Sequence, residues 1–183
     1  MIYDSFAPTE QPELQQILSI MNIQPNQTFC DLGSGEGDVV IAAAQLGAIA
    51  TGMEIDDHYY NLSLQKINDQ SIQNASIVKQ NFYTQDFNGY DILYTNLSED
   101  VIRKIWDKLL TCHANGSKIY MYMGIEGYRR CFNCDSVLYE ETHPNVRVVK
   151  FDLSNTPWFL GKTGYSHIPE TSRLYTHVLM IMD

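Results

Sequence analysis

The chain has 183 residues, a hydrophobic fraction of 44% and a formal net charge of −10, from 22 acidic and 12 basic side chains. This length is typical of one globular domain with a substantial core. The negative charge disfavours a nucleic-acid partner, because phosphate binding needs a basic surface, and it fits a small molecule or a basic protein better. Acidity that only keeps the chain soluble explains the charge equally well.

No apolar run approaches the length needed to span a bilayer. The first ten residues, MIYDSFAPTE, lack the basic and then apolar layout of a signal peptide. We therefore expect a soluble cytoplasmic protein without a membrane partner.

Apolar residues at helical spacing predict a first helix over residues 9–21, which ends before a turn at Pro25 and Asn26. Beyond that turn, short apolar runs alternate with helical patterns as far as residue 124. The predicted strands are TFCDLG (28–33), AIATGME (48–54), ASIVKQN (75–81), DILYTNL (91–97) and SKIYMYMG (117–124). The predicted helices are DVVIAAAQL (38–46), DDHYYNLSLQKIND (56–69) and SEDVIRKIWDKLL (98–110).

Strands that alternate with helices predict an α/β fold, a mostly parallel sheet with helices on both faces. After residue 125 the pattern changes, and three runs are strand-like: VRVVKFDL (146–153), PWFLGKTG (157–164) and RLYTHVLMI (173–181). No long helical pattern separates the last two. Two such runs joined by a turn-rich segment predict an antiparallel pair at one edge of the sheet.

The stretch TFCDLGSGEGDVVIAAA (28–44) places glycines at 33, 35 and 37, between a predicted strand and a predicted helix. Glycine permits a positive φ and lets a ligand approach the main chain closely. The free N–H groups at the start of the helix point into the same space. Ligands of such sheets bind at the carboxyl ends of the strands, so the loop predicts a cofactor site.

Three details restrict the chemical class of the expected cofactor. The glycine spacing is G-x-G-x-G, whereas dinucleotide sites have G-x-G-x-x-G. Asp31, beside the loop, would repel a phosphate and attract an ammonium group. Glu54 ends the second strand, 21 residues after Gly33, where an acid can accept hydrogen bonds from both ribose hydroxyls. A ligand with an amino-acid end and a ribose but no phosphate satisfies all three details, and S-adenosylmethionine is that ligand.

The segments DLGSGEGD (31–38) and GMEID (52–56) resemble the class I S-adenosylmethionine-dependent methyltransferases, over residues 6–124. The resemblance implies a Rossmann-like fold and a role for each matching residue. Asp31, Gly33, Ser34, Gly35 and Gly37 would hold the methionine part of the cofactor. Glu54 would hold the ribose, Ile55 would pack on the adenine face, and Asn81, followed by Phe82, replaces the usual acid near the adenine amine. The asparagine carbonyl oxygen can still accept that hydrogen bond.

The segment from FAPTEQPEL to DVVIAAA is similar to the small single-domain protein-lysine methyltransferases of archaea and their mitochondrial relatives. In them the Pro-Thr segment lies over the cofactor, which implies that role for Pro8 and Thr9. Their fourth strand ends in Tyr-Leu-Leu-Pro, whereas this chain has YTNLSED (94–100). We expect one domain over residues 1–183. It comprises an N-terminal segment and helix (1–26), a cofactor-binding half (27–124) and substrate-side strands and loops (125–183).

The resemblance implies a lysine-bearing protein as methyl acceptor, and the negative charge of the chain favours a basic one. Tyr94 and Asn96, at the end of the fourth strand, are the candidate catalytic residues, which would position the amine. Further candidates for the lining of an aromatic pocket are Tyr3, Phe6, Tyr122 and Trp158. A base aminomethyltransferase is disfavoured, because the segment TNLS (95–98) lacks the prolines of the usual Asn/Asp-Pro-Pro-aromatic motif.

Several alternatives stay open at this stage. The acceptor can be a small molecule or an RNA, or the chain can be a partner subunit that binds S-adenosylmethionine without turnover. The glycine spacing and Asp31 both argue against the hypothesis that the chain is a dehydrogenase. Cys131 and Cys134 form a C-x-x-C that could bind zinc with Cys112 or His113, but reduced structural thiols explain the four cysteines better, and no metal site is expected.

Overall fold

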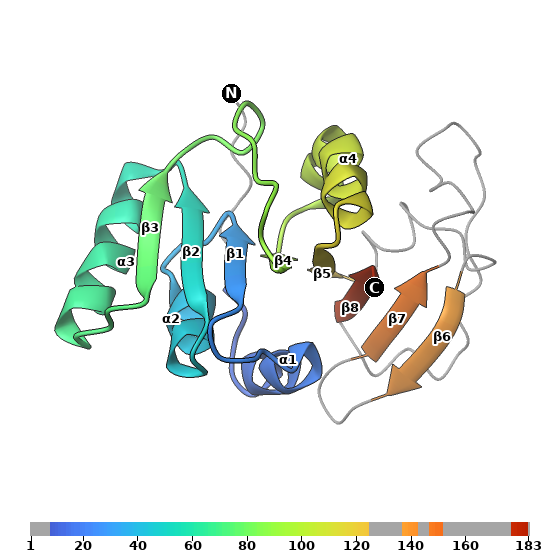
Figure 1. Cartoon of the computed structure of the whole chain (residues 1–183), viewed down its shortest axis with the longest axis horizontal. Helices are drawn as coiled ribbons and strands as arrows, with labels where there is room; N and C mark the ends of the chain where they lie inside the picture. Colours follow the sequence, from blue (N-terminus) through green and yellow to red (C-terminus); the bar gives the residue numbers. More distant parts are fainter. Residues whose placement is uncertain (1–7, 125–136, 143–146, 152–176, 183) are drawn as a thin grey trace.

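The computed structural model describes residues 8–124, 137–142, 147–151 and 177–182 (Figure 1). The helices are α1 (Glu13–Met21), α2 (Asp38–Gln45), α3 (Asp57–Asp69) and α4 (Glu99–Ala114). The first five strands are β1 (Thr28–Leu32), β2 (Ile49–Glu54), β3 (Ala75–Lys79), β4 (Ile92–Thr95) and β5 (Lys118–Gly124). The last three are β6 (Val137–Thr142), β7 (Arg147–Phe151) and β8 (His177–Met182). Within the described ranges, no helix has the length and apolar character needed to cross a membrane.

The strands form one sheet of eight in the order β3-β2-β1-β4-β5-β8-β7-β6. Strands β1 to β5 are parallel to one another. Strand β8 pairs antiparallel with β5, β7 pairs parallel with β8, and β6 pairs antiparallel with β7. The predicted α/β class, the mostly parallel sheet and the antiparallel edge are therefore confirmed.

The composition of the antiparallel edge differs in detail from the expectation. The run 146–153 contains β7 and the run 173–181 contains most of β8, and these two strands are parallel to each other. The expected antiparallel pair of 157–164 with 173–181 stays a prediction. The antiparallel partner of β7 is β6, a strand that the sequence patterns did not predict. The run 157–164 lies outside the described residues.

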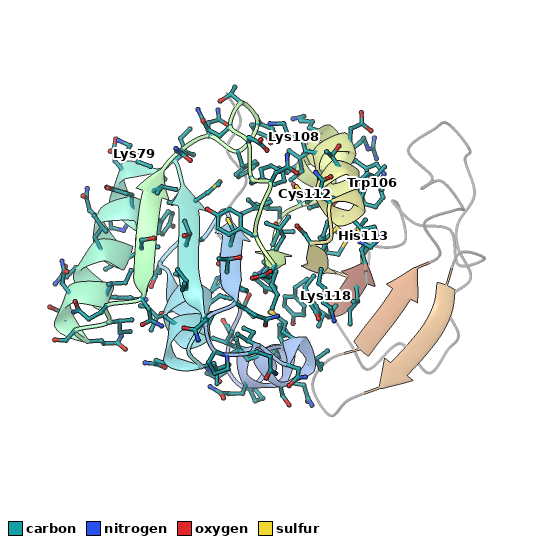
Figure 2. All side chains as sticks on the ribbon, viewed as in Figure 1. Lys79, Trp106, Lys108, Cys112, His113 and Lys118 are labelled. Carbon is teal, nitrogen blue, oxygen red and sulfur yellow. The ribbon has the colours of Figure 1, made fainter. Side chains whose placement is uncertain are left out.

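The core has two layers, one on each face of the sheet. The apolar stripe of α1 consists of Leu14, Ile17, Leu18 and Met21, as its spacing predicts, and it packs with residues of α2 and α3 on one face. Helix α4 covers the other face with its own apolar stripe. It also carries Lys108 and Cys112 toward the loop that follows β3 (Figure 2). Helices therefore cover both faces, as expected for a buried parallel sheet.

The strand order indicates where a ligand is expected to bind. From β1 the chain moves outward through β2 to β3, and it then returns to the other side of β1 to form β4 and β5. Strand β1 thus marks the point where the strand order reverses. In open α/β sheets the ligand site lies at the carboxyl ends of the strands at such a point. Here that position is shared by the ends of β1 and β4.

Candidate cofactor and acceptor site

The glycine loop follows β1 and adopts the conformation that only glycine takes readily. Gly33, Gly35 and Gly37 have φ values of 79°, 51° and 80°. The N–H groups of Gly33 and Ser34 donate to the carbonyl oxygen of Met53 at 2.9 and 3.1 Å, which ties the loop to β2. A Cβ atom on Gly33 would lie 2.8 Å from Leu97 Cδ2, and one on Gly37 would lie 2.8 Å from Ser63 Cβ. The loop is therefore packed tightly against its neighbours, at positions where a larger residue than glycine would not fit.

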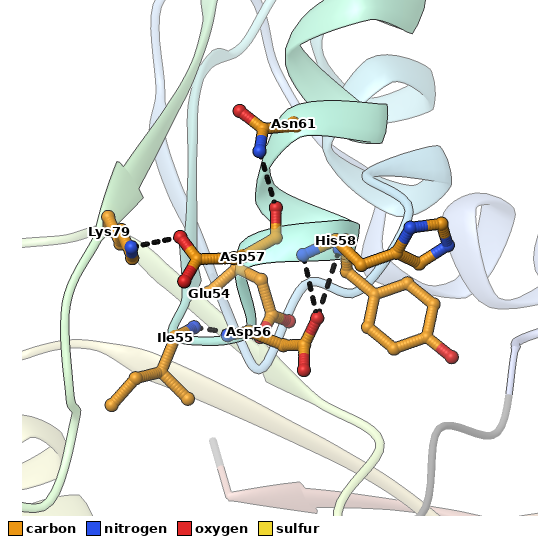
Figure 3. A network of polar contacts seen from close by, with 8 residues as sticks. Glu54, Ile55, Asp56, Asp57, His58, Asn61 and Lys79 are labelled. Carbon is orange, nitrogen blue, oxygen red and sulfur yellow. Dashed lines mark hydrogen bonds and ion pairs between the residues drawn. The ribbon is translucent and has the colours of Figure 1, made fainter.

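Glu54 ends β2 and its carboxylate lies against the glycine loop. It is 8% exposed, and Oε2 accepts from the Gly35 N–H at 2.8 Å. Oε1 accepts from the N–H groups of Ile55 and Asp56, both at 2.7 Å. Figure 3 shows this turn between β2 and α3, where Asp56 in turn accepts from the first N–H groups of the helix. Oε1 thus accepts two hydrogen bonds and Oε2 one, which leaves Oε2 able to accept from a further donor, such as a hydroxyl of a ribose.

Asp31 is a second buried carboxyl group in the same region, with 3% of its surface exposed. No side chain among the described residues donates a hydrogen bond to it. Burial, and secondarily the charge of Glu54, raises the pKa of Asp31 from 3.8 to about 8. An isolated buried carboxylate is costly, and a cation at the same place would remove that cost. Asp31 therefore fits the ammonium end of an amino-acid-like ligand.

At the end of β4, residues far apart in the sequence meet through hydrogen bonds. The Tyr94 hydroxyl and the Thr9 hydroxyl are 2.8 Å apart, and Asn96 Nδ2 donates to Thr9 Oγ1 at 3.2 Å. Tyr94 is directly opposite Asp31 in the register of β4 and β1, so the two side chains lie on the same face of the sheet. The structure thus brings together Thr9, Tyr94 and Asn96 beside Asp31. The N-terminal segment reaches the carboxyl ends of the strands at this point.

Burial strongly raises the pKa of Tyr94, which is 1% exposed. The hydrogen bond with Thr9 acts in the opposite direction, and the nearby Asp31 adds to the increase. The hydroxyl group is therefore protonated at neutral pH and can both donate and accept a hydrogen bond. Such a group can orient a polar ligand without carrying a charge.

The loop after β3 supplies the remaining predicted residues. The Gln80 N–H donates to the Glu54 carbonyl oxygen at 3.1 Å, and Asn81 Oδ1 accepts from the Tyr83 N–H at 2.9 Å. Phe82 Cε1 lies 3.8 Å from the position of a Cβ atom on Gly33, so this ring reaches the glycine loop. Asn81 and Phe82 therefore lie at the edge of the same site. Half-buried Ile55 directly follows Glu54, in the turn between β2 and α3.

The remaining predicted residues lie in the core or outside the described ranges. Tyr122 is 4% exposed in the core layer that contains Tyr94, close enough to contribute to the raised pKa of Tyr94, and burial raises its own pKa. Cys30 and Cys112 are buried free thiols, and the described residues contain no group of metal-binding side chains. The residues outside the described ranges are Tyr3, Phe6, Trp158, Cys131 and Cys134.

Two residues near the site were not predicted. Leu97 contacts the glycine loop at Gly33, and its place directly after Asn96 could have indicated this. Lys108 donates to the main chain of the loop after β3. Its position in the helical pattern indicates only that it lies on a partly exposed face of the helix. The contact with the loop after β3 therefore could not be predicted from the local sequence.

The fold and this arrangement of carboxylates and glycines define an S-adenosylmethionine-dependent methyltransferase. Residues 31–122, half of the chain, match the family described as the ANTKMT methyltransferase domain. The chain belongs to this family, and its cofactor is S-adenosylmethionine.

Relatives of known activity act on different acceptors. A protein-lysine N-methyltransferase of Saccharolobus islandicus is 30% identical over 111 residues, which cover 57% of this chain and 69% of that protein. An rRNA adenine N-6-methyltransferase of Escherichia coli is 25% identical over 146 residues, which cover 76% of this chain. That match covers only 57% of the rRNA enzyme, so this chain spans little more than half of its length.

The fold is also that of solved methyltransferases. An RNA methyltransferase from Salinibacter ruber, in complex with S-adenosyl-L-homocysteine, superposes with a TM-score of 0.62 at 17% sequence identity. The superposition covers 75% of this chain and 87% of that one.

Proposed function

We propose that the protein methylates lysine side chains of other proteins, and that the cluster of Thr9, Tyr94 and Asn96 positions the acceptor amine. The observation that carries the proposal is this cluster of uncharged polar groups at the end of β4, next to the buried Asp31. The resemblance to an archaeal protein-lysine methyltransferase and the net charge of −10 support the same acceptor. A lysine-bearing, basic protein would be attracted to such a chain.

The cofactor would be held by the residues that surround the glycine loop. Asp31 would pair with the methionine ammonium group, while the backbone of Gly33, Ser34, Gly35 and Gly37 would surround the methionine part. Glu54 would accept from the ribose hydroxyls. Ile55, Asn81 and Phe82 would contact the adenine, and Thr9 would close the site from the N-terminal side. Asp31, a buried carboxyl group that forms no ion pair among the described residues, and the positive φ angles of the glycine loop both fit this ligand.

When bound, S-adenosylmethionine supplies an electrophilic methyl group, which an uncharged amine accepts in one displacement. A lysine amine has an ordinary pKa of about 10.4, so it must lose a proton before it reacts. Burial beside Tyr94 lowers that pKa by desolvation, and no dedicated base is then needed. The oxygen atoms of Tyr94 and Asn96 would accept hydrogen bonds from the amine and orient its lone pair. Thr9 holds both side chains in place.

A second candidate function is methylation of an RNA base. It is favoured by the longer match to an rRNA adenine methyltransferase, 76% of the chain against 57% for the lysine enzyme. It is disfavoured by the negative charge and by the absence of proline in residues 95–98. We also propose that residues 1–183 form one domain, with the substrate-side segments after residue 124.

The proposal is tested by giving the protein S-adenosylmethionine with a labelled methyl group and a mixed cell extract. The label is then separated into protein, RNA and small-molecule fractions, and the labelled protein is hydrolysed. Methyl-lysine is the expected product, whereas label in RNA would replace the proposal with the second candidate. Label in no fraction, with cofactor binding confirmed, would indicate a binding subunit.

The role of the cluster is tested in the same assay with Tyr94→Phe. We expect the turnover rate to fall by about tenfold or more, because the amine loses an orienting acceptor. Affinity for S-adenosylhomocysteine should change little. Tyr90→Phe is the matched control, since Tyr90 lies before β4, at the end opposite to Tyr94. Equal activities of the two variants would contradict the role of Tyr94.

A further inference from the structure

Lys108, on α4, makes three hydrogen bonds to the main chain of a single loop. Its ammonium group donates to the carbonyl oxygens of Phe82, Tyr83 and Gln85 at 3.1, 2.7 and 2.9 Å. Lysine has three N–H donors, so all of them are used on this loop. Figure 2 shows Lys108 on the side of α4 that faces the loop after β3. The ammonium group of Lys108 therefore binds three carbonyl oxygens of this loop at once.

The loop that Lys108 holds is the part of the chain proposed to contact adenine. It begins beside the proposed ribose site, because the Gln80 N–H donates to the carbonyl oxygen of Glu54. The carbonyl oxygen of Asn81 accepts from Thr84 and Gln85, both at 3.0 Å, which closes a tight turn. The Phe82 carbonyl oxygen accepts from Lys108, while the Phe82 ring extends to the glycine loop. The ammonium group therefore binds the same turn whose side chains reach the candidate cofactor site.

The contacts of Lys108 differ from those of its neighbour Lys104, one helical turn earlier. Lys104 is exposed, and its ammonium group lies 5.8 Å from the centre of the Tyr83 ring. Lys108 is half-buried, lies 5.6 Å from the Phe87 ring and bonds directly to the backbone. Hydrogen bonds from a charged donor are roughly twice as strong as neutral ones. Lys104 is thus a natural control for a positive charge on the same face of the helix.

We propose that Lys108 is a positioning residue for cofactor recognition, which sets the affinity and the base selectivity of the site through the loop of residues 80–85. This inference rests on the proposed contact of Asn81 and Phe82 with adenine. Lys108 itself does not contact the cofactor. It holds Asn81 and Phe82 in the arrangement that recognises the base.

The test compares binding of S-adenosylhomocysteine and S-inosylhomocysteine, whose base lacks the exocyclic amine, by calorimetry. Lys108→Met keeps the aliphatic stem and removes the donors. We expect its affinity for S-adenosylhomocysteine to fall by about tenfold, and its preference for adenine over hypoxanthine to shrink. Lys104→Met should keep both quantities within about twofold of the wild type. Lys108→Arg keeps the charge and should recover part of the preference.

Several outcomes would overturn the inference. One is a Lys108→Met variant that melts earlier but binds both ligands like the wild type, since the lysine would then be structural only. Another is an equal loss of affinity for S-adenosylhomocysteine in Lys104→Met and Lys108→Met, since any positive charge on this face of α4 would then have the same effect. If Lys108→Met does not fold, an unchanged base preference in Asn81→Ala would exclude the loop as a reader of the base, and with it the positioning role of Lys108. None of these measurements needs an acceptor, so an error about lysine methylation leaves them valid.

Discussion

At the scale of single residues, the site contains two buried carboxyl groups in different surroundings. Glu54 accepts three backbone hydrogen bonds, whereas no side chain among the described residues donates to Asp31. In the unfolded chain Asp31 has its ordinary pKa of 3.8, and in the folded protein the pKa is about 8. Between these pH values the folded state retains a proton that the unfolded state has lost. The contribution of Asp31 to stability therefore decreases as the pH rises from about 4 to about 8.

This difference predicts that Asp31→Asn changes the pH dependence of stability. The free energy of unfolding of the ligand-free wild type should include a component that falls from about pH 5 to about pH 8, and the variant should lack it. Urea denaturation at several pH values measures both curves. Parallel curves would show that Asp31 ionises normally in the folded protein.

Cofactor binding should show the opposite dependence on pH. In the proposed site the methionine ammonium group pairs with the ionised form of Asp31, so affinity for S-adenosylhomocysteine should increase as the pH rises toward about 8. Binding below that pH should release a proton, which calorimetry in buffers of different ionisation enthalpy detects. Asp31→Asn should bind more weakly and should release no proton. Wild-type affinity in this variant would exclude the ammonium contact.

The glycine loop permits a prediction with a close control. Gly37 has a φ of 80°, and a Cβ atom there would lie 2.8 Å from Ser63 Cβ, whereas Gly89 has a φ of 90° and no atom within 4 Å of a Cβ. Gly89→Ala should cost about 1 kcal/mol for backbone strain alone. Gly37→Ala adds a steric clash and should cost about 3 kcal/mol. The difference in the free energy of unfolding measures the packing of the loop against α3, and equal costs would exclude a tight contact.

At the scale of secondary structure, the elements from α1 to β5 could be predicted because each has a local signal. The apolar stripe of α1 has helical spacing, and the central strands are short apolar runs bounded by turns. Asp31 and Glu54 could be found because each stands where a strand ends. Strand β6 and the parallel pairing of β7 with β8 were missed, since pairing between distant strands leaves no local pattern. The contact between Lys108 and the loop after β3 is non-local for the same reason.

The N-terminal segment and β4 are joined by the hydrogen bond between Thr9 and Tyr94. A double-mutant cycle with Thr9→Val and Tyr94→Phe should give a coupling of about 1 kcal/mol in the free energy of unfolding, because each single change leaves a polar group unpaired. The control cycle uses Thr51 and Ser76, an exposed pair at 3.4 Å, where the coupling should be close to zero. Similar couplings in the two cycles would mean that the hydrogen bond between Thr9 and Tyr94 does not stabilise the contact of the N-terminal segment with β4.

At the scale of the whole molecule, the site depends on the topology of the sheet more than on any one segment. The glycine loop, Glu54, the loop after β3 and the end of β4 come from different parts of the chain. They meet because parallel strands place their carboxyl ends at one edge. The cluster of Thr9, Tyr94 and Asn96 lies at this edge beside Asp31, so the residues proposed to hold the cofactor and the acceptor are adjacent. This arrangement suits a direct transfer from one ligand to the other.

The charge of the whole chain predicts how salt affects the reaction with each class of acceptor. A chain of net charge −10 attracts a lysine-rich protein and repels a polyphosphate. Because salt screens both forces, kcat/KM for a lysine-rich peptide should fall severalfold between about 0.02 M and about 0.3 M salt. A peptide with one lysine and no net charge is the control, and its rate should change little. If RNA were the acceptor, screening would weaken the repulsion and the rate would increase over the same range. The sign of the salt dependence therefore separates the two acceptors even when both carry some label, since it reports which one the electrostatic field of the protein attracts.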